Sequence, residues 1–237
     1  MSRRESQEPP PSGGGPTPEP GGSSGPGAAL ATKMGGQVGF LLDLNRCVGC
    51  GACVVACRIE NDLPAGVAWR RILTLNQKRK SQGPTYHFSL ACHHCYDPPC
   101  VKGCPSGALE KRPDGIVFLH EAICLGCRYC EMTCPFGAPA YDEERQVMTK
   151  CHLCAPRQER GLQPACTQAC PTGALRFSGD IGDVPDSFVA PEEVPGFSDP
   201  GGFEPSLRLS PPGGGIRASS FEKLTKLAGP AHGGRDG

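Results

Sequence analysis

The chain has 237 residues and equal numbers of basic and acidic side chains, 24 of each, so its formal net charge is zero. This balance argues against a nucleic-acid partner, because such binding depends on neutralising phosphates. Aromatic residues make up only 6% of the chain, whereas Gly contributes 33 residues and Pro 26. We therefore expect a loop-rich fold with a small apolar core.

The N-terminal segment, residues 1–36, is dominated by Pro, Gly and Ser and lacks helical or strand periodicity, so we expect it to be disordered. Arg3 and Arg4 resemble the start of a twin-arginine export signal, but no apolar stretch follows them, and we interpret them as ordinary tail charge. The longest apolar runs, such as Val38 to Leu42 and Ala52 to Cys57, fall far short of the roughly 20 residues that span a bilayer. We expect the chain to fold in the cytoplasm and to cross no membrane itself.

All 16 cysteines lie between Cys47 and Cys170, in four groups of four. Groups one and three have the spacing C-x2-C-x2-C-x3-C, group two has a wider middle gap, and group four has a longer loop between its second and third cysteines. Groups two, three and four each end in Cys-Pro. The four groups are Cys47, Cys50, Cys53 and Cys57; Cys92, Cys95, Cys100 and Cys104; Cys124, Cys127, Cys130 and Cys134; and Cys151, Cys154, Cys166 and Cys170.

This spacing is typical of [4Fe-4S] clusters. A tight loop reaches three iron corners of a cubane, and in two-cluster ferredoxins the cysteine before the proline supplies the fourth corner of the other cluster. Four ligands for each cubane divide the 16 cysteines into four clusters with none left over. Because ligation contributes directly to folding, we expect the chain without metal not to hold its fold.

Structural zinc and disulfides are the alternatives. Zinc sites usually pair two C-x2-C units across a longer spacer, and a third cysteine so close by is surplus to a tetrahedral site. Disulfide frameworks belong to short secreted chains, and we find no secretory signal in this sequence. We therefore favour iron-sulfur clusters.

Short elements are expected around these groups, in chain order. Val38 to Leu42 is an apolar run suited to a strand, and residues 58–63 could continue a short helix. Further strands are predicted over Trp69 to Leu75 and His87 to Ala91. Residues 109–119 have the pattern of a β-hairpin, with Asp-Gly in the turn.

One exit turn occurs three times, in Cys104-Pro-Ser-Gly-Ala-Leu109, Cys134-Pro-Phe-Gly-Ala-Pro139 and Cys170-Pro-Thr-Gly-Ala-Leu175. We expect its glycine to let the backbone approach the cluster closely. The repetition indicates reuse of one cluster-binding unit.

His93, His94 and His152 lie beside the cysteines and could be mistaken for metal ligands. With four cysteines for each cluster, we expect them to hydrogen-bond or to face solvent. The sequence contains no phosphate-binding glycine loop, no pairing of nucleophile with base and no open metal site. It therefore predicts electron transfer without catalysis by this chain.

Residues 179–237 are rich in Pro, Gly and acidic residues, with Phe188, Phe197 and Phe203 as isolated apolar anchors. We interpret this segment as an extended arm rather than a domain. Phe221 to Ala228 has helical spacing, and a short amphipathic helix at the end of an arm would suit docking on a neighbouring subunit. A partly disordered tail is the alternative.

The order of the four groups, the eleven-residue insertion in group four and three stretches resemble the electron-transfer iron-sulfur subunit of the dimethyl sulfoxide reductase family of molybdoenzymes. The stretches are Cys92-His-His-Cys95-x4-Cys100, Ile123-Cys-Leu-Gly-Cys-Arg-Tyr-Cys130 and Met148-Thr-Lys-Cys151. The resemblance covers roughly residues 37–178 and leaves both tails outside it. Related subunits serve polysulfide, tetrathionate and nitrite reductases, formate dehydrogenases and membrane-bound sulfite dehydrogenases.

The resemblance implies that group one exchanges ligands with group four, and group two with group three. Spacing alone leaves open the pairing of one with two and of three with four. The implied ligands are Cys47, Cys50, Cys53 and Cys170 for cluster 1; Cys57, Cys151, Cys154 and Cys166 for cluster 2; Cys92, Cys95, Cys100 and Cys134 for cluster 3; and Cys104, Cys124, Cys127 and Cys130 for cluster 4.

Together these observations predict an α+β fold class, with tandem ferredoxin-like 2[4Fe-4S] folds built from short β-hairpins and small helices around the clusters. The four 4Fe-4S motifs are expected at residues 37–67, 83–114, 115–144 and 145–178. They lie between the disordered tail, residues 1–36, and the C-terminal docking arm, residues 179–237.

In the family, a large catalytic subunit carries a molybdopterin cofactor and an integral membrane anchor subunit reacts with quinol or quinone. The resemblance implies that this chain relays electrons between them, as in anaerobic respiration. It would be peripheral to the cytoplasmic membrane through these partners, with the cytoplasmic face favoured and export beside a signal-bearing partner as the alternative. The same role in a sulfite dehydrogenase, a polysulfide or tetrathionate reductase or a formate dehydrogenase stays open, as does a free multi-cluster ferredoxin.

Overall fold

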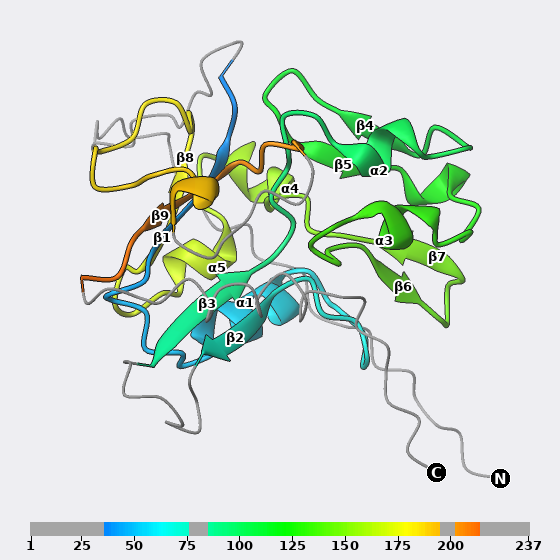
Figure 1. The fold of residues 1–237 in the computed structure, drawn as a ribbon. Coiled ribbons are helices and arrows are strands. Elements are labelled where there is room, and N and C mark those ends of the chain that lie inside the picture. Colours follow the sequence, from blue (N-terminus) through cyan, green and yellow to red (C-terminus); the bar gives the residue numbers. More distant parts are fainter. Residues whose placement is uncertain (1–35, 76–84, 195–201, 214–237) are drawn as a thin grey trace, which may run out of the picture.

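The computed structural model describes residues 36–75, 85–194 and 202–213. Within these ranges, short helices and strands are joined by long loops (Figure 1). Almost all of the predicted N-terminal tail, the predicted helix at Phe221 to Ala228 and the predicted anchor Phe197 lie outside the described residues.

The strands of the described residues form one three-stranded sheet and three hairpins. In the sheet, β1 (Gly39–Asp43) lies between β8 (Leu175–Ser178), to which it is antiparallel, and β9 (Leu207–Ser210), to which it is parallel. The hairpins pair β2 (Arg71–Leu75) with β3 (Tyr86–Leu90), β4 (Leu109–Lys111) with β5 (Val117–Leu119), and β6 (Ala140–Asp142) with β7 (Val147–Thr149).

The helices are short, and each α-helix contains or directly follows a cysteine. They are α1 (Ala52–Glu60), α2 (Pro99–Lys102), α3 (Tyr129–Thr133), α4 (Ala155–Gln158) and α5 (Ala165–Gln168), with 3-10 turns η1 (Glu121–Ile123) and η2 (Pro191–Glu193). Helix α1 packs against α5, and α2 packs against α3. Cysteine group one therefore lies beside group four, and group two beside group three (Figure 1).

The apolar core has two main parts, of which the larger includes cysteines from groups one, two and four. The larger part surrounds β1, β3 and β9, where Leu42, Phe88 and Leu209 are fully buried. The smaller part lies between the hairpins β4–β5 and β6–β7 and includes Leu109 and Met148. Cysteine side chains belong to both parts, so the packed interior and the sulfur sites are the same regions of the protein.

The elements predicted before cysteine group two are confirmed with small shifts. The apolar run that predicted a strand forms β1, and the two strands predicted after group one form the hairpin β2–β3, of which β2 begins at Arg71. The helix predicted over residues 58–63 is wrong at its end, because α1 stops at Glu60. The Asn61 side chain donates to the Cys57 carbonyl oxygen over 2.8 Å and so satisfies one of the carbonyls left free at the helix end.

The hairpin predicted over residues 109–119 is confirmed as β4–β5. The Asp114 side chain accepts the backbone N–H of Ile116 over 3.0 Å, and Gly115 has a φ of 87°. This positive φ is the conformation for which glycine is favoured in a tight turn.

The described part of the C-terminal segment differs from the extended arm expected over residues 179–237. Strand β9 extends the chain's own sheet, and both Leu207 and Leu209 are buried. Ser206 donates its backbone N–H to the His93 carbonyl and its hydroxyl to the His94 carbonyl, each over 2.9 Å. The segment thus ties the β1 sheet to the loop of group two, while its docking on another subunit stays a prediction.

Close packing explains why this strand can pair with β1. A Cβ atom on Gly39 would lie 2.3 Å from the Ser206 carbonyl oxygen, so only glycine allows the two backbones to approach in this way. The predicted anchors Phe188 and Phe203 also pack on this chain itself. Four alternating residues in a Pro- and Gly-rich context are too weak a pattern to predict such a strand.

No helix among the described residues has both the length and the apolar character needed to cross a membrane.

Candidate iron-sulfur centres

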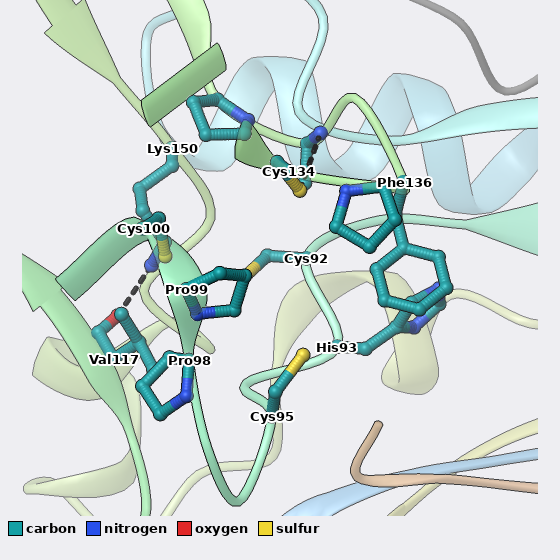
Figure 2. Close-up of a pocket in the computed structure, with 13 residues that line it drawn as sticks. Cys92, His93, Cys95, Pro98, Pro99, Cys100, Val117, Cys134, Phe136 and Lys150 are labelled. Atoms are coloured by element: carbon teal, nitrogen blue, oxygen red, sulfur yellow. Dashed lines mark hydrogen bonds between the residues drawn. The ribbon is translucent and has the colours of Figure 1, made fainter. Parts of the chain in front are cut away.

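Three cysteines of group two and one cysteine of group three meet around one cavity. Figure 2 shows the side chains of Cys92, Cys95, Cys100 and Cys134 turned toward a common space. The empty volume is about 350 Å³, which includes some open solvent. Phe136 closes one side, with the His93 ring edge-on against it at a centroid distance of 4.6 Å.

A second cavity, of about 310 Å³ with some open solvent included, lies at the junction of groups one and four. Its cysteine lining consists of Cys47, Cys50, Cys53 and Cys170. The side chains of Ile72 and Ser89 from the hairpin β2–β3 complete its wall. The last cysteine of group four is therefore brought to the first three cysteines of group one.

The remaining cysteines gather in two further sets. Burial raises the pKa of Cys57 to about 12, and the nearby thiols of Cys166 and Cys154 add to this effect, against the opposing charge of Arg70. The pKa of Cys151 is raised well above its usual value by burial and by Cys57 and other thiols. The Asn61 side-chain nitrogen lies 3.8 Å from Cys57 Sγ and 4.0 Å from Cys154 Sγ, so these two thiols are neighbours.

The fourth set is centred on Cys130 in α3. Burial raises the pKa of Cys130 to about 12, and the thiols of Cys124, Cys104 and Cys127 add to this effect. In the two cavities the structure brings together the cysteines that the family resemblance implies as ligands of clusters 3 and 1, while the ligand sets of clusters 2 and 4 stay a prediction. Binding of iron by these sulfurs stays a prediction.

All 16 cysteines are free thiols in the structure. Among the described residues, no three His, Cys, Asp or Glu side chains lie close enough together to hold a single metal ion. In the two cavities, the four sulfurs surround a space instead.

The ligand loops share one backbone feature that sequence reasoning missed. The residue before the second cysteine of each group has a positive φ: 68° at Gly49, 46° at His94, 63° at Gly126 and 55° at Leu153. Only two of these positions hold glycine, so the other two are held by their surroundings in a conformation that side chains disfavour. An alignment of the four loops would have revealed the two glycines but not the shared conformation.

The repeated exit turn also has a conformational reason. Gly107, Gly137 and Gly173 have φ angles of 66°, 54° and 60°. In Gly107 an added Cβ would meet no other protein atom within 4 Å. The left-handed backbone, and not the close approach of other protein atoms, explains the glycine at this position.

Hydrogen-bond donors surround the sulfurs. Cys124 Sγ accepts the backbone N–H groups of Gly126 and Met148 over 3.5 and 3.4 Å, and Cys170 Sγ accepts that of Leu175 over 3.4 Å. The Thr172 hydroxyl lies 3.7 Å from Cys170 Sγ. Donors of this kind stabilise negative charge on cluster sulfur, so the surroundings of Cys124 and Cys170 fit an iron-sulfur cluster.

The residue after the proline of the exit turn affects the pKa of the cysteine before that proline. Burial favours the neutral thiol of Cys104, yet the Ser106 hydroxyl and backbone N–H groups outweigh burial and lower its pKa. A similar balance, in which burial is outweighed by the Leu175 backbone N–H and the Thr172 hydroxyl, lowers the pKa of Cys170. Group three has Phe136 in this place, and there burial raises the pKa of Cys134.

The histidines were expected to hydrogen-bond or to face solvent, and this expectation holds only in part. His93 and His94 are buried, so neither faces solvent, and the His93 ring nitrogens have no hydrogen-bond partner among the described residues. His94 Nδ1 accepts the Val117 backbone N–H over 3.0 Å, as the hydrogen-bonding alternative predicts. Burial lowers the pKa of His93 to about 3, so its ring is neutral at physiological pH.

Two buried cations lie near the sulfurs, and sequence reasoning missed one of them, Arg70. Lys150 is 3% exposed, donates to the carbonyl oxygens of Val117 and Cys151, and lines the first cavity (Figure 2). Arg70 is 2% exposed and lies just before β2. Strand alternation places Arg70 on the same side as Ile72, which faces the second cavity, and this signal could have indicated an inward arginine.

Comparison with known proteins supports the cysteine chemistry. Two family models, each described as a 4Fe-4S dicluster domain, match residues 84–180 and residues 46–108. The chain is 44% identical over 149 residues to a subunit of the anaerobic dimethyl sulfoxide reductase of Escherichia coli (strain K12), covering 60% of this chain and 73% of that protein.

Two other relatives carry different substrate names. The chain is 40% identical over 176 residues to a sulfite dehydrogenase subunit of Allochromatium vinosum, covering 65% of this chain and 72% of that protein. It is 39% identical over 145 residues to a thiosulfate reductase electron transfer subunit of Salmonella typhi, covering 60% of this chain and 75% of that protein. The similarity therefore extends across enzymes with different substrates.

Proposed function

Since this chain belongs to the family of iron-sulfur electron-transfer subunits of dimethyl sulfoxide reductase-type complexes, we propose that it carries four [4Fe-4S] clusters and connects two partner subunits. One partner would be a catalytic subunit with a molybdopterin cofactor. The other would be an integral membrane anchor that reacts with quinol or quinone. The chain itself is a non-catalytic subunit of an oxidoreductase complex.

The observation that supports the proposal is that, around each of two cavities, three thiols of one cysteine group meet one thiol of another group. Bound clusters would supply one-electron carriers at these places. The proposed ligands are those of clusters 1 to 4 as defined above, within four tandem ferredoxin-like motifs. The chain's own role is to hold these ligands at fixed positions and to exclude water from them.

Two exposed cysteines suggest where electrons enter and leave. Cys50 and Cys127 are exposed, whereas most of the other cysteines are buried. Val48 is 60% exposed and lies two residues before Cys50, in the cluster 1 loop. Leu125 is 69% exposed and lies two residues before Cys127, in the cluster 4 loop. Exposed apolar side chains near a ligand are suited to contact with another protein, so we assign one partner to each of these two places.

The direction of electron flow and the substrate belong to the catalytic partner. The relatives include both reductase and dehydrogenase subunits, so the same relay is compatible with either direction. We propose a position at the cytoplasmic face of the membrane, reached through the partner subunits. Export together with a signal-bearing partner is the alternative that fractionation of cells would detect.

The test is an anaerobic purification of the native complex from its own membranes, with iron, molybdenum and zinc measured and the co-purifying chains identified. We expect about 16 iron atoms for each copy of this chain, which is four cubanes of four irons, together with molybdenum and a membrane protein. Iron without molybdenum or partners would favour a free ferredoxin, and zinc in place of iron would refute electron transfer.

A further inference from the structure

Arg70 is a cation enclosed in the protein without a carboxylate partner. Its Nη1 donates to the Ser89 hydroxyl over 2.8 Å and to the Ser89 carbonyl oxygen over 3.3 Å. Its Nε and Nη2 have no hydrogen-bond partner among the described residues, and none of the ion pairs found there includes Arg70. A buried charge without a counter-charge strongly destabilises a fold, so something else must neutralise this guanidinium.

Cysteine sulfurs act on Arg70, and a cysteine binds metal as the negative thiolate. Burial works to lower the pKa of Arg70, but the thiols of Cys166, Cys151, Cys53 and Cys57 raise it above its usual value. Arg70 acts on Cys57 in return, opposing the effect of burial on that thiol. Three of these four cysteines belong to cluster 2, and Cys53 belongs to cluster 1.

The Ser89 hydroxyl and the Phe40 ring hold the guanidinium at this junction. Ser89 lies in β3 opposite Ile72 of β2, and its hydroxyl is 3.3 Å from Cys53 Sγ as well as 2.8 Å from Arg70. On another side, the Arg70 guanidinium carbon lies 4.5 Å from the centroid of the Phe40 ring in β1. The serine hydroxyl thus links the arginine directly to a cluster 1 sulfur, and the aromatic ring limits its movement.

Resting on the four-cluster relay proposed above, we propose that Arg70 raises the reduction potentials of clusters 1 and 2 by placing a fixed positive charge between them. Its two unpartnered nitrogens would be available to donate to a cluster bound at these sites. A reduced cluster carries one more negative charge than an oxidised one, so a nearby fixed cation stabilises the reduced form. The effect is larger at cluster 2, which supplies most of the sulfurs near Arg70.

The experiment is an anaerobic redox titration of the complete complex, followed by electron paramagnetic resonance, in Arg70→Gln, Arg70→Lys and Arg176→Gln variants. Arg176 is the matched control, because its guanidinium also stacks on an aromatic ring, 4.7 Å from Phe188, but at an exposed position. In Arg70→Gln we expect the ratio of reduced to oxidised cluster 2 at a fixed potential to fall about tenfold, which corresponds to ~59 mV for one electron. Cluster 1 should shift in the same direction by less.

Arg70→Lys keeps the charge and should restore most of the potential, while Arg176→Gln should match the unmodified protein. Arg70→Gln with full iron content and unchanged potentials would overturn the proposal, as would an equal shift in Arg70→Lys. If the unmodified complex itself lacked the four clusters, the proposed function would be refuted instead.

A second measurement does not depend on the folding of Arg70→Gln. When arginine is labelled with ¹⁵N, the reduced clusters of the unmodified protein should show a hyperfine coupling to nitrogen that disappears in Arg70→Lys and persists in Arg176→Gln. The same coupling in all three proteins would show that Arg70 does not donate to the cluster sulfurs and would overturn the proposal.

Discussion

Replacement of Thr172 by valine should lower the reduction potential of cluster 1. The Thr172 hydroxyl lies 3.7 Å from Cys170 Sγ and is one of the groups that lower the pKa of that thiol. A donor to sulfur stabilises the more negative, reduced form of a cluster. Valine has nearly the same shape as threonine but cannot donate, so the change removes the donor with little effect on packing.

The size of the effect follows from the hydrogen bond. A typical net contribution is about 1 kcal/mol, and about 1.4 kcal/mol is a tenfold change in an equilibrium constant, or ~59 mV for one electron. Because the oxidised cluster also benefits from the donor, we expect a fall of roughly 20 to 40 mV. The Leu175 N–H remains bonded to Cys170 Sγ over 3.4 Å, so the cluster should still assemble.

The assay is a redox titration monitored by electron paramagnetic resonance, with Thr167→Val as the matched control. Thr167 belongs to the same cysteine group, but its hydroxyl donates to the Pro164 carbonyl oxygen over 2.8 Å. This variant should leave the potential of cluster 1 unchanged. Equal shifts in the two variants, or no shift in Thr172→Val, would refute the reasoning that the exit-turn hydroxyl sets the potential.

The remaining predictions concern the ligand pairing, the C-terminal segment and the metal. Cys57→Ser should perturb the resonance signal of cluster 2 and leave cluster 1 with its own four cysteines. Altered signals from the group two site would instead indicate that group one pairs with group two. Leu209→Ala should destabilise the protein by about 2 to 5 kcal/mol, because this side chain of β9 is fully buried and its loss leaves a cavity; denaturant unfolding of the iron-loaded chain measures this, and a midpoint equal to that of the unmodified protein would mean that β9 does not support the fold. Removal of iron by a chelator should abolish the near-ultraviolet circular dichroism, since the free energy of ligation contributes to folding and is lost with the metal; a native spectrum in the iron-free chain would contradict this.

Local sequence was sufficient where one short segment determines the structure. The spacing inside each cysteine group reflects the small distance between the corners of a cubane, and that geometry acts within a few residues. The hairpin β4–β5 also depends on a local turn with glycine at a positive φ. For the same reason, the apolar run before group one predicted β1 to within a residue.

Spacing could not choose which groups share a cavity, and only the family resemblance suggested an answer. The pairing of group one with group four depends on the packing of α1 against α5, which lie more than a hundred residues apart in the chain. No local pattern encodes such a contact, because many arrangements of four similar units satisfy the same spacing.

The positions of the C-terminal segment and of Arg70 also could not be predicted from local sequence. The sequence of β9 resembles a loop, and its burial comes from pairing with β1 and from the close approach permitted by Gly39. Arg70 resembles a surface cation until the fold surrounds it with sulfurs from two distant groups. The sequence by itself determined the chemistry of the cysteine groups, whereas the tertiary structure decided which groups meet and which charge lies between them, because both depend on contacts between segments far apart in the chain.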